Sequence, residues 1–116
     1  MSITIFHNPG CSKSQQTLEL LNEKGIDPEI VLYLESTLSM QQLNSVVDKL
    51  GIEPQKLVRY KESTAKELNL SETDERSAAE WVDIMIENPI LIERPIVISG
   101  DRAAIGRPPE NVLEII

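Results

Sequence analysis

The stretch that decides the fold is Ile3-Thr4-Ile5-Phe6-His7-Asn8-Pro9-Gly10-Cys11-Ser12-Lys13-Ser14. Its first four residues are strand formers, and residues 7–10 are a strong turn signal. A helix is predicted from Ser12 to about Lys24, where the next residue is a glycine of the kind that commonly ends helices. Residues 29–33 then predict a mostly buried strand. A strand, a helix and a second strand in this order predict a right-handed parallel crossover.

The middle of the chain predicts helices only. Ser39 with Gln42 is a capping-box signature, and it begins a helix that Gly51 ends. Apolar residues recur at helical spacing between these two ends. Three further helical segments are predicted: a short one from Pro54, part of residues 61–69, and residues 78–87, which end before Pro89.

The last third of the chain returns to strands. Residues 95–98 and 102–105 predict a hairpin whose turn is Ser99-Gly100-Asp101. A final short helix is predicted over residues 110–116, with three apolar side chains facing inward: Val112, Leu113 and Ile116.

The order of these elements predicts an α/β fold. It is β-α-β, then a helical insert at about residues 37–88, then β-β-α. An open four-stranded mixed sheet with helices on its faces would bury the apolar side of every piece. The length of 116 residues suits one domain, so we predict a single domain over residues 1–116.

Composition and charge exclude several classes of protein. The chain has 19 acidic and 11 basic residues and a net charge of −8, which argues against a general nucleic-acid or membrane-surface binder. We expect a cytoplasmic protein, because residues 1–6 lack the basic and apolar regions of a secretory signal. Nothing predicts an obligate oligomer, and we expect a monomer. One cysteine and one histidine allow no internal disulfide and no Cys/His zinc site.

The candidate for chemistry is Cys11, between the first strand and the first helix. A thiol at a helix N-terminus meets unpaired N–H groups and the positive end of the helix dipole, which lower its pKa. The same N–H groups could hold an oxyanion. Gly10 leaves the sulfur uncrowded, Lys13 adds positive charge, and His7 either adds charge or forms a hydrogen bond nearby.

Each of these residues also has a purely structural interpretation. A free cysteine is often an inert core residue, but the polar neighbours of Cys11 favour a reactive thiol. His7 could be a strand-end histidine satisfied by the backbone, and Ser12, Lys13 and Ser14 could be a solvated first turn. Because Ser14 stands where a second cysteine would complete Cys-x-x-Cys, any redox turnover needs an outside thiol.

Three arginines form the second candidate group. Arg59 follows a short helix, and Arg94 and Arg107 each stand directly before a proline at a break in the chain. Guanidinium groups make two-pronged contacts with tetrahedral oxyanions, so these residues could form a basic pocket in an acidic protein. Taken singly, each could equally be a surface residue. The Arg94–Pro95 bond could be cis or trans, and the pattern of residues does not decide between them.

Four segments together resemble the ArsC family of arsenate reductases, the glutathione- and glutaredoxin-dependent type with a thioredoxin-like, glutaredoxin-like fold. They are His7–Ser14, Leu57-Val58-Arg59, Asn88–Val97 and Gly106-Arg107-Pro108. The resemblance runs from about Ile3 to Ile116, so it covers nearly the whole chain.

The resemblance implies a role for each matched residue. Cys11 would attack arsenate, and His7 would help to keep the thiol ionised. Arg59, Arg94 and Arg107 would hold the oxyanion and its covalent adduct. Pro95 would be the cis-proline of thioredoxin-like folds, and Asn8, Gly10, Ser12, Lys13 and Ser14 would support the site. Glutathione would be a co-substrate and glutaredoxin a partner, with no bound cofactor and no metal.

The sequence departs from the family pattern at one place, and two functions other than arsenate reduction are alternatives. The best-known arsenate reductases of the family carry Cys-Gly-Thr-Ser, whereas this chain has Cys11-Ser12-Lys13-Ser14. That difference affects the identity of the physiological substrate more than the fold. The alternatives are a Spx-like regulatory domain that binds RNA polymerase and a monothiol glutaredoxin-like thiol exchanger. Spx-like proteins typically carry Cys-x-x-Cys at this turn, so Ser14 counts against the first.

Overall fold

The structure is a computed structural model that describes residues 3–35 and 38–116. The described residues form two compact units, the first over residues 3–35 and 94–116 and the second over residues 38–93. The predicted start of a helical insert at residue 37 lies outside the described residues, and the single-domain assignment stays a prediction. None of the helices in these ranges is long and apolar enough to cross a membrane.

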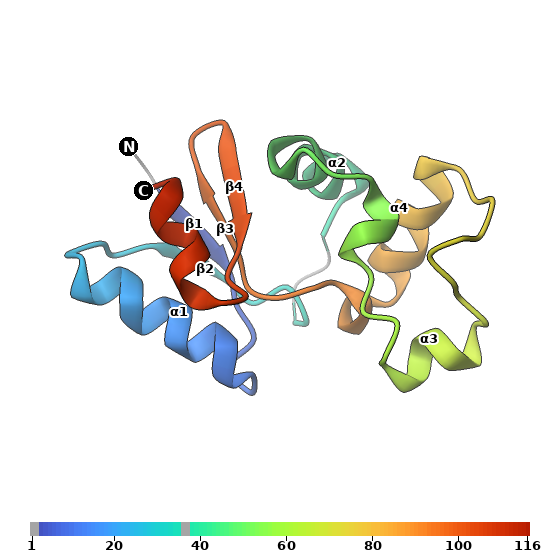
Figure 1. The fold of residues 1–116 in the computed structure, drawn as a ribbon, viewed down its shortest axis with the longest axis horizontal. Coiled ribbons are helices and arrows are strands. Elements are labelled where there is room, and N and C mark those ends of the chain that lie inside the picture. Colours follow the sequence, from blue (N-terminus) through green and yellow to red (C-terminus); the bar gives the residue numbers. More distant parts are fainter. Residues whose placement is uncertain (1–2, 36–37) are drawn as a thin grey trace. The chain divides into compact units, whose positions relative to one another are not determined.

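A four-stranded sheet is the frame of the first unit (Figure 1). The strand order is β2-β1-β3-β4, with β1 and β2 parallel and the other two pairs antiparallel. The predicted mixed sheet, with its β-α-β beginning and β-β-α end, is therefore confirmed. The strands are β1 (Ile3–Phe6), β2 (Glu29–Val31), β3 (Ile96–Ser99) and β4 (Arg102–Ile105).

Two helical segments cover one face of this sheet. They are α1 (Ser12–Glu23) and the 3₁₀ helix η3 (Pro109–Glu114), which contact each other. Each element contributes a fully buried apolar side chain to one cluster: Ile5 from β1, Leu21 from α1, Val97 from β3 and Val112 from η3. This core packs α1 and η3 together against the sheet.

The second strand differs from its prediction in length and in burial. It ends at Val31 rather than residue 33, and the side chains of Glu29 and Ile30 are exposed. The physical reason is that β2 is an edge strand with a hydrogen-bonded neighbour on one side only. Tyr33 is buried, but it lies beyond the strand.

The last helical segment also differs from its prediction. Val112 is buried as expected, whereas Leu113 and Ile116 are exposed. Because a 3₁₀ helix has three residues per turn, positions 109, 112 and 115 share one face. The predicted inward face assumed the wider spacing of an α-helix.

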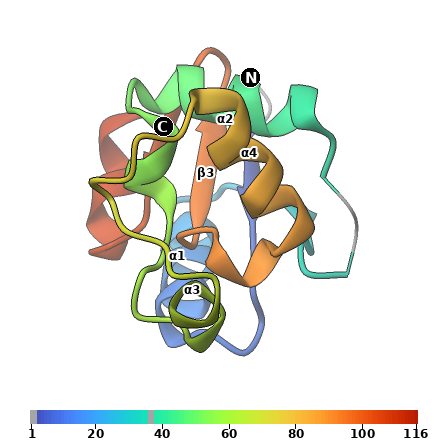
Figure 2. The same cartoon turned by 90° about the vertical axis from the view of Figure 1, so that its right-hand side faces the viewer.

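The second unit is helical, as predicted. The capping box at Ser39 and Gln42 is confirmed, and a second one joins Ser77 to Glu80. The helices α2 and α4 contact each other (Figure 2). The helices of the unit are α2 (Met40–Leu50), η1 (Pro54–Leu57), α3 (Ser63–Glu67), α4 (Ala78–Glu87) and η2 (Pro89–Leu91).

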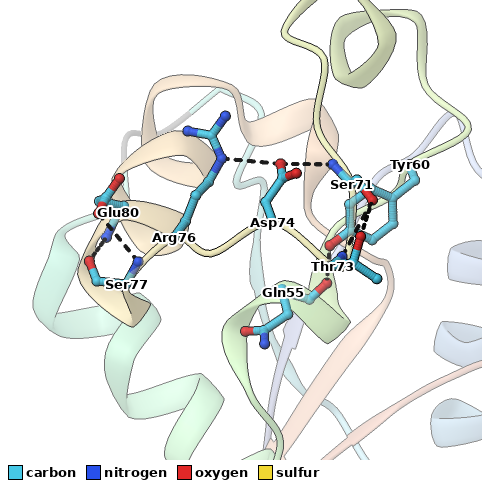
Figure 3. A network of polar contacts seen from close by, with 8 residues as sticks. All are labelled: Gln55, Tyr60, Ser71, Thr73, Asp74, Arg76, Ser77 and Glu80. Carbon is cyan, nitrogen blue, oxygen red and sulfur yellow. Dashed lines mark hydrogen bonds and ion pairs between the residues drawn. The ribbon is translucent and has the colours of Figure 1, made fainter.

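Local polar contacts organise the segment between α3 and α4, and a separate hydrogen bond joins Tyr60 to Gln55 (Figure 3). Asp74 accepts from the Ser71 N–H at 3.0 Å and from Arg76 Nε at 3.3 Å. The Arg76 guanidinium carbon lies 5.7 Å from the centre of the buried Trp81 ring, at cation–π distance. Tyr60 meets the same ring edge-on and donates to the Gln55 carbonyl at 2.6 Å. Burial, Glu72 and Asp74 raise the pKa of Tyr60 to about 12, so this donor stays protonated.

Candidate active site

Cys11 is the residue that caps the N-terminus of α1. Its backbone is extended, with φ −107° and ψ 122°, and its carbonyl accepts the N–H of Gln15 at 3.0 Å. Asn8 shapes the preceding turn: its carbonyl accepts the Cys11 N–H, and its side-chain oxygen accepts the Gly10 N–H, both at 3.0 Å. The turn that residues 7–10 predict therefore places the Cys11 thiol at the N-terminus of α1.

Two of the three predicted arginines meet at the Cys11 sulfur. Arg107 Nη2 lies 3.4 Å from Sγ and donates to it. The Arg94 guanidinium also acts on this sulfur, because its donor groups and its positive charge lower the pKa of the thiol. Arg107 Nε donates to the Arg94 carbonyl at 2.7 Å, so the backbone of one arginine fixes the side chain of the other. Cys11 is 8% exposed, which places both positive charges against a largely desolvated sulfur.

The pKa of the Cys11 thiol lies below its ordinary value. Burial alone would raise this pKa, but the Ser14 N–H, the Arg94 guanidinium and the Lys13 N–H together outweigh it. The Cys11 side chain forms no hydrogen bond that caps α1. The backbone N–H groups of Ser14 and Lys13 nevertheless lower the pKa of its thiol. The contribution of Lys13 is its backbone N–H. The sequence had suggested its side-chain charge instead.

Tyr33 belongs to this site, although no motif in the sequence marks it. Burial would lower the pKa of Arg94, but contacts with Cys11 and with Tyr33 raise it. Tyr33 is 1% exposed and follows β2. Because β1 and β2 are parallel, their carboxyl ends lie at the same edge of the sheet. That rule would have placed Tyr33 near the Cys11 turn.

His7 bonds to Ser14 and not to the sulfur. His7 Nδ1 lies 2.6 Å from Ser14 Oγ, and both side chains are buried. In the described ranges no hydrogen bond joins His7 to Cys11. Burial lowers the pKa of His7, which favours the neutral ring at neutral pH. Of the two roles that the sequence left open for His7, the structure contains the hydrogen bond to a neighbour.

Arg59 lies in the second unit, in an ion-pair cluster of its own. Its backbone N–H donates to the Leu91 carbonyl at 2.7 Å. Its Nη1 lies 2.6 Å from a Glu62 carboxylate oxygen, and its Nε lies 3.6 Å from Glu93. The structure thus brings Arg94 and Arg107 to the thiol and holds Arg59 between two carboxylates.

Tight packing holds the segments that carry the two arginines of the first unit. The Arg94–Pro95 peptide bond is cis, as the family resemblance implied, and the Arg107–Pro108 bond is also cis, which the sequence did not predict. The Gly106 N–H donates to the Pro95 carbonyl at 2.9 Å. A Cβ at Gly106 would lie 2.5 Å from Thr17 Oγ1 and 2.8 Å from Pro95 Cγ. There is no room for a side chain at this position.

This arrangement suits attack by a thiolate on an oxyanion. The lowered pKa supplies the nucleophilic form of sulfur, and two guanidinium groups can stabilise negative charge on the oxygens of an anion bound beside it. Across residues 3–35 and 38–116 there is no group of three His, Cys, Asp or Glu side chains that could hold a metal ion. Ser12 is exposed at the start of α1 and makes no hydrogen bond through its side chain in the described part of the chain.

Comparison with known proteins gives matches over the whole chain. An arsenate reductase from Haemophilus influenzae is 52% identical over 117 residues, covering all of both chains. An uncharacterised Escherichia coli K12 protein, YfgD, is 47% identical and covers 98% of this chain and 96% of its own. The structure of an arsenate reductase from Vibrio cholerae superposes with a TM-score of 0.95 at 46% identity, covering 100% of this chain and 98% of that one. The family model described as "ArsC family" matches residues 6–115. With a family match and full-length relatives of this similarity, the chain belongs to the ArsC family.

Proposed function

We propose that this protein reduces arsenate to arsenite through a covalent adduct on Cys11, with glutathione as co-substrate and glutaredoxin as electron donor. The observation that carries the proposal is the meeting of a low-pKa thiol with Arg94 and Arg107 in the first unit. Relatives that match over their whole length and carry the name arsenate reductase support the choice of substrate.

The first step forms a bond without any change of oxidation state. The Cys11 thiolate attacks As(V), an arsenic–oxygen bond breaks, and the leaving hydroxide takes a proton to become water. Arg94 and Arg107 neutralise negative charge on the remaining oxygens as it redistributes. The role of Arg59 as a third oxyanion ligand stays a prediction of the family resemblance; in the second unit its guanidinium pairs with Glu62 and Glu93.

The reduction itself needs thiols from outside, because Cys11 is the only cysteine in the chain. A glutathione thiolate displaces a second oxygen from the Cys11-bound arsenic. The glutaredoxin thiolate then takes the glutathione sulfur, and the electron pair of the broken As–S bond stays on arsenic, which becomes As(III). A further glutathione releases glutaredoxin as glutathione disulfide forms. Water displaces Cys11 and arsenite leaves.

The test is arsenite formation by the purified protein with different electron donors. We expect arsenite with glutathione plus glutaredoxin, one for each glutathione disulfide formed, and little with a thioredoxin system. Phosphate in place of arsenate is the matched control, because it has the same shape and charge and cannot be reduced under these conditions.

Each possible result decides a different part of the proposal. Equal rates with thioredoxin would contradict the donor but leave the substrate intact. No arsenite with either donor would contradict the activity itself. Turnover of a glutathione mixed disulfide, unaffected by arsenate, would favour the monothiol exchanger instead.

A further inference from the structure

We propose that Thr17 is a positioning residue for Arg107, because it holds the turn from which the Arg107 guanidinium reaches the Cys11 sulfur. Thr17 and Cys11 belong to the same helix: Cys11 is the N-cap of α1, and Thr17 lies in its second turn. One rigid element then carries the nucleophile and also fixes the charge beside it. The inference rests on the proposed function only in taking Cys11 and Arg107 as parts of the site.

Thr17 is buried where α1 meets the turn at Gly106, directly after β4. Its side chain is 0% exposed, and its Oγ1 donates to the Lys13 carbonyl at 2.8 Å. The same oxygen lies 3.5 Å from the Gly106 carbonyl oxygen. A Cβ at position 106 would lie 2.5 Å from Thr17 Oγ1 and 3.1 Å from Thr17 Cγ2. The hydroxyl of Thr17 is therefore the part of its side chain that comes closest to the Gly106 backbone.

Two other contacts hold the same turn. The Gly106 N–H donates to the Pro95 carbonyl at 2.9 Å, and the Asn111 amide donates to the Arg107 carbonyl at 3.0 Å. Pro95 and Asn111 come from the C-terminal part of the chain, whereas Thr17 comes from the helix that carries the thiol. Thr17 is therefore the contact that relates the position of this turn to that of the sulfur.

The position of this turn decides where the Arg107 charge lies. Arg107 directly follows Gly106, and its Nη2 lies 3.4 Å from Cys11 Sγ. Its Nε donates to the Arg94 carbonyl at 2.7 Å, so the side chain has little freedom to compensate if its own backbone moves. The attraction between two charges weakens as the distance between them grows. A shift of the Gly106 backbone should therefore weaken the hold of Arg107 on an anion at the sulfur.

The test compares alkylation of Cys11 by iodoacetate, which is an anion, with alkylation by iodoacetamide, which is neutral. Both reagents react with the thiolate, so the ratio of the two rates is independent of the thiolate fraction and reports the positive charge beside the sulfur. Cys11 is the only cysteine in the chain, so both rates report this residue alone. At low ionic strength we expect the ratio of the iodoacetate rate to the iodoacetamide rate to fall roughly threefold in Thr17→Ala.

A double-mutant cycle shows whether Thr17 acts through Arg107. Arg107→Gln removes the charge itself, so we expect it to lower the ratio further than Thr17→Ala does. In the Arg107→Gln background, Thr17→Ala should cause no additional fall, because the charge that Thr17 positions is already absent. Thr17→Ser keeps the hydroxyl that lies against Gly106, and we expect it to restore most of the wild-type ratio.

Leu18→Ala is the matched control for a general loss of packing. Leu18 is the next residue of α1 and packs against the core of the first unit. We expect its truncation to lower the urea midpoint and to leave the ratio unchanged. Urea unfolding of each variant shows whether it is folded. If Thr17→Ala is not folded, Thr17→Val removes the hydroxyl while keeping the volume, and we expect the same fall in the ratio.

Four results would overturn the inference. An unchanged ratio in folded Thr17→Ala would mean that the contact with Gly106 does not position Arg107. An equal fall in the Arg107→Gln background would mean that Thr17 acts through another group. An equal fall in Leu18→Ala would mean a general loosening of α1. A ratio in Thr17→Ser as low as in Thr17→Ala would mean that the hydroxyl is not the positioning contact. Because no arsenate is used, these outcomes are distinct from a failure of the proposed function.

Discussion

Replacing Cys11 with serine is expected to lower the rate of arsenate reduction by roughly a thousandfold or more, comparable with the loss of the nucleophile in other covalent mechanisms. The hydroxyl is not ionised at neutral pH, and oxygen is a weaker nucleophile than sulfur. No second thiol in the chain can replace Cys11. The measurement is arsenite formation with glutathione and glutaredoxin at saturating arsenate.

The fold of this variant should survive, because serine is close to cysteine in size and the site is at the edge of the core. Equal urea midpoints for Cys11→Ser and wild type would show that the lost activity is chemical. If Cys11→Ser kept a tenth or more of the wild-type rate, the covalent mechanism would be wrong.

Replacing Gly106 with alanine should destabilise the fold by about 2–3 kcal/mol, as expected for overpacking of a buried site. The new Cβ would lie 2.5 Å from Thr17 Oγ1 and 2.8 Å from Pro95 Cγ, so α1 or the Pro95 segment must move. Both carry parts of the site, and Arg107 is the next residue in the chain. We therefore expect a higher KM for arsenate as well as a lower urea midpoint.

Matched variants show whether the cause is this collision. Gly10→Ala puts the same methyl group 3.4 Å from Asn8 Oδ1, an ordinary contact, and should cost much less stability. Thr17→Ala removes two of the three atoms that the Gly106→Ala methyl would meet, so the double variant should be more stable than the sum of the single effects predicts. A loss of less than about 0.5 kcal/mol for Gly106→Ala would show that the packing relaxes freely.

Most of the fold could be predicted because its signals are local. Gly25 and Gly51 lie at positive φ after their helices, and the Ser39 capping box begins α2 as the pattern indicated. The edge position of β2 and the three-residue turns of η3 depend on tertiary pairing and crowding. Periodicity in a single sequence holds no information on either feature, which is why the predictions for residues 29–33 and for Leu113 differ from the structure.

The site was predictable as a set of residues and less so as a set of contacts. A cysteine after Pro-Gly and arginines before prolines are visible in the sequence. The partners of His7 and Tyr33 are not, because a hydrogen bond between Nδ1 and Ser14 or a contact with Arg94 arises only when strand, turn and helix are assembled. Arg59 shows the same effect in the second unit, where two carboxylates hold it.

The central claim is that Cys11 is held as a reactive thiolate by the first turn of α1 and by Arg94. The measurement that tests it most directly is the pH dependence of alkylation of this single thiol in the folded protein. We predict a midpoint below the value of about 8.5 for a thiol in a model peptide. The midpoint should rise in Arg94→Gln because a positive charge beside the sulfur is lost. A midpoint at or above the model-peptide value, unmoved by that substitution, would contradict the account.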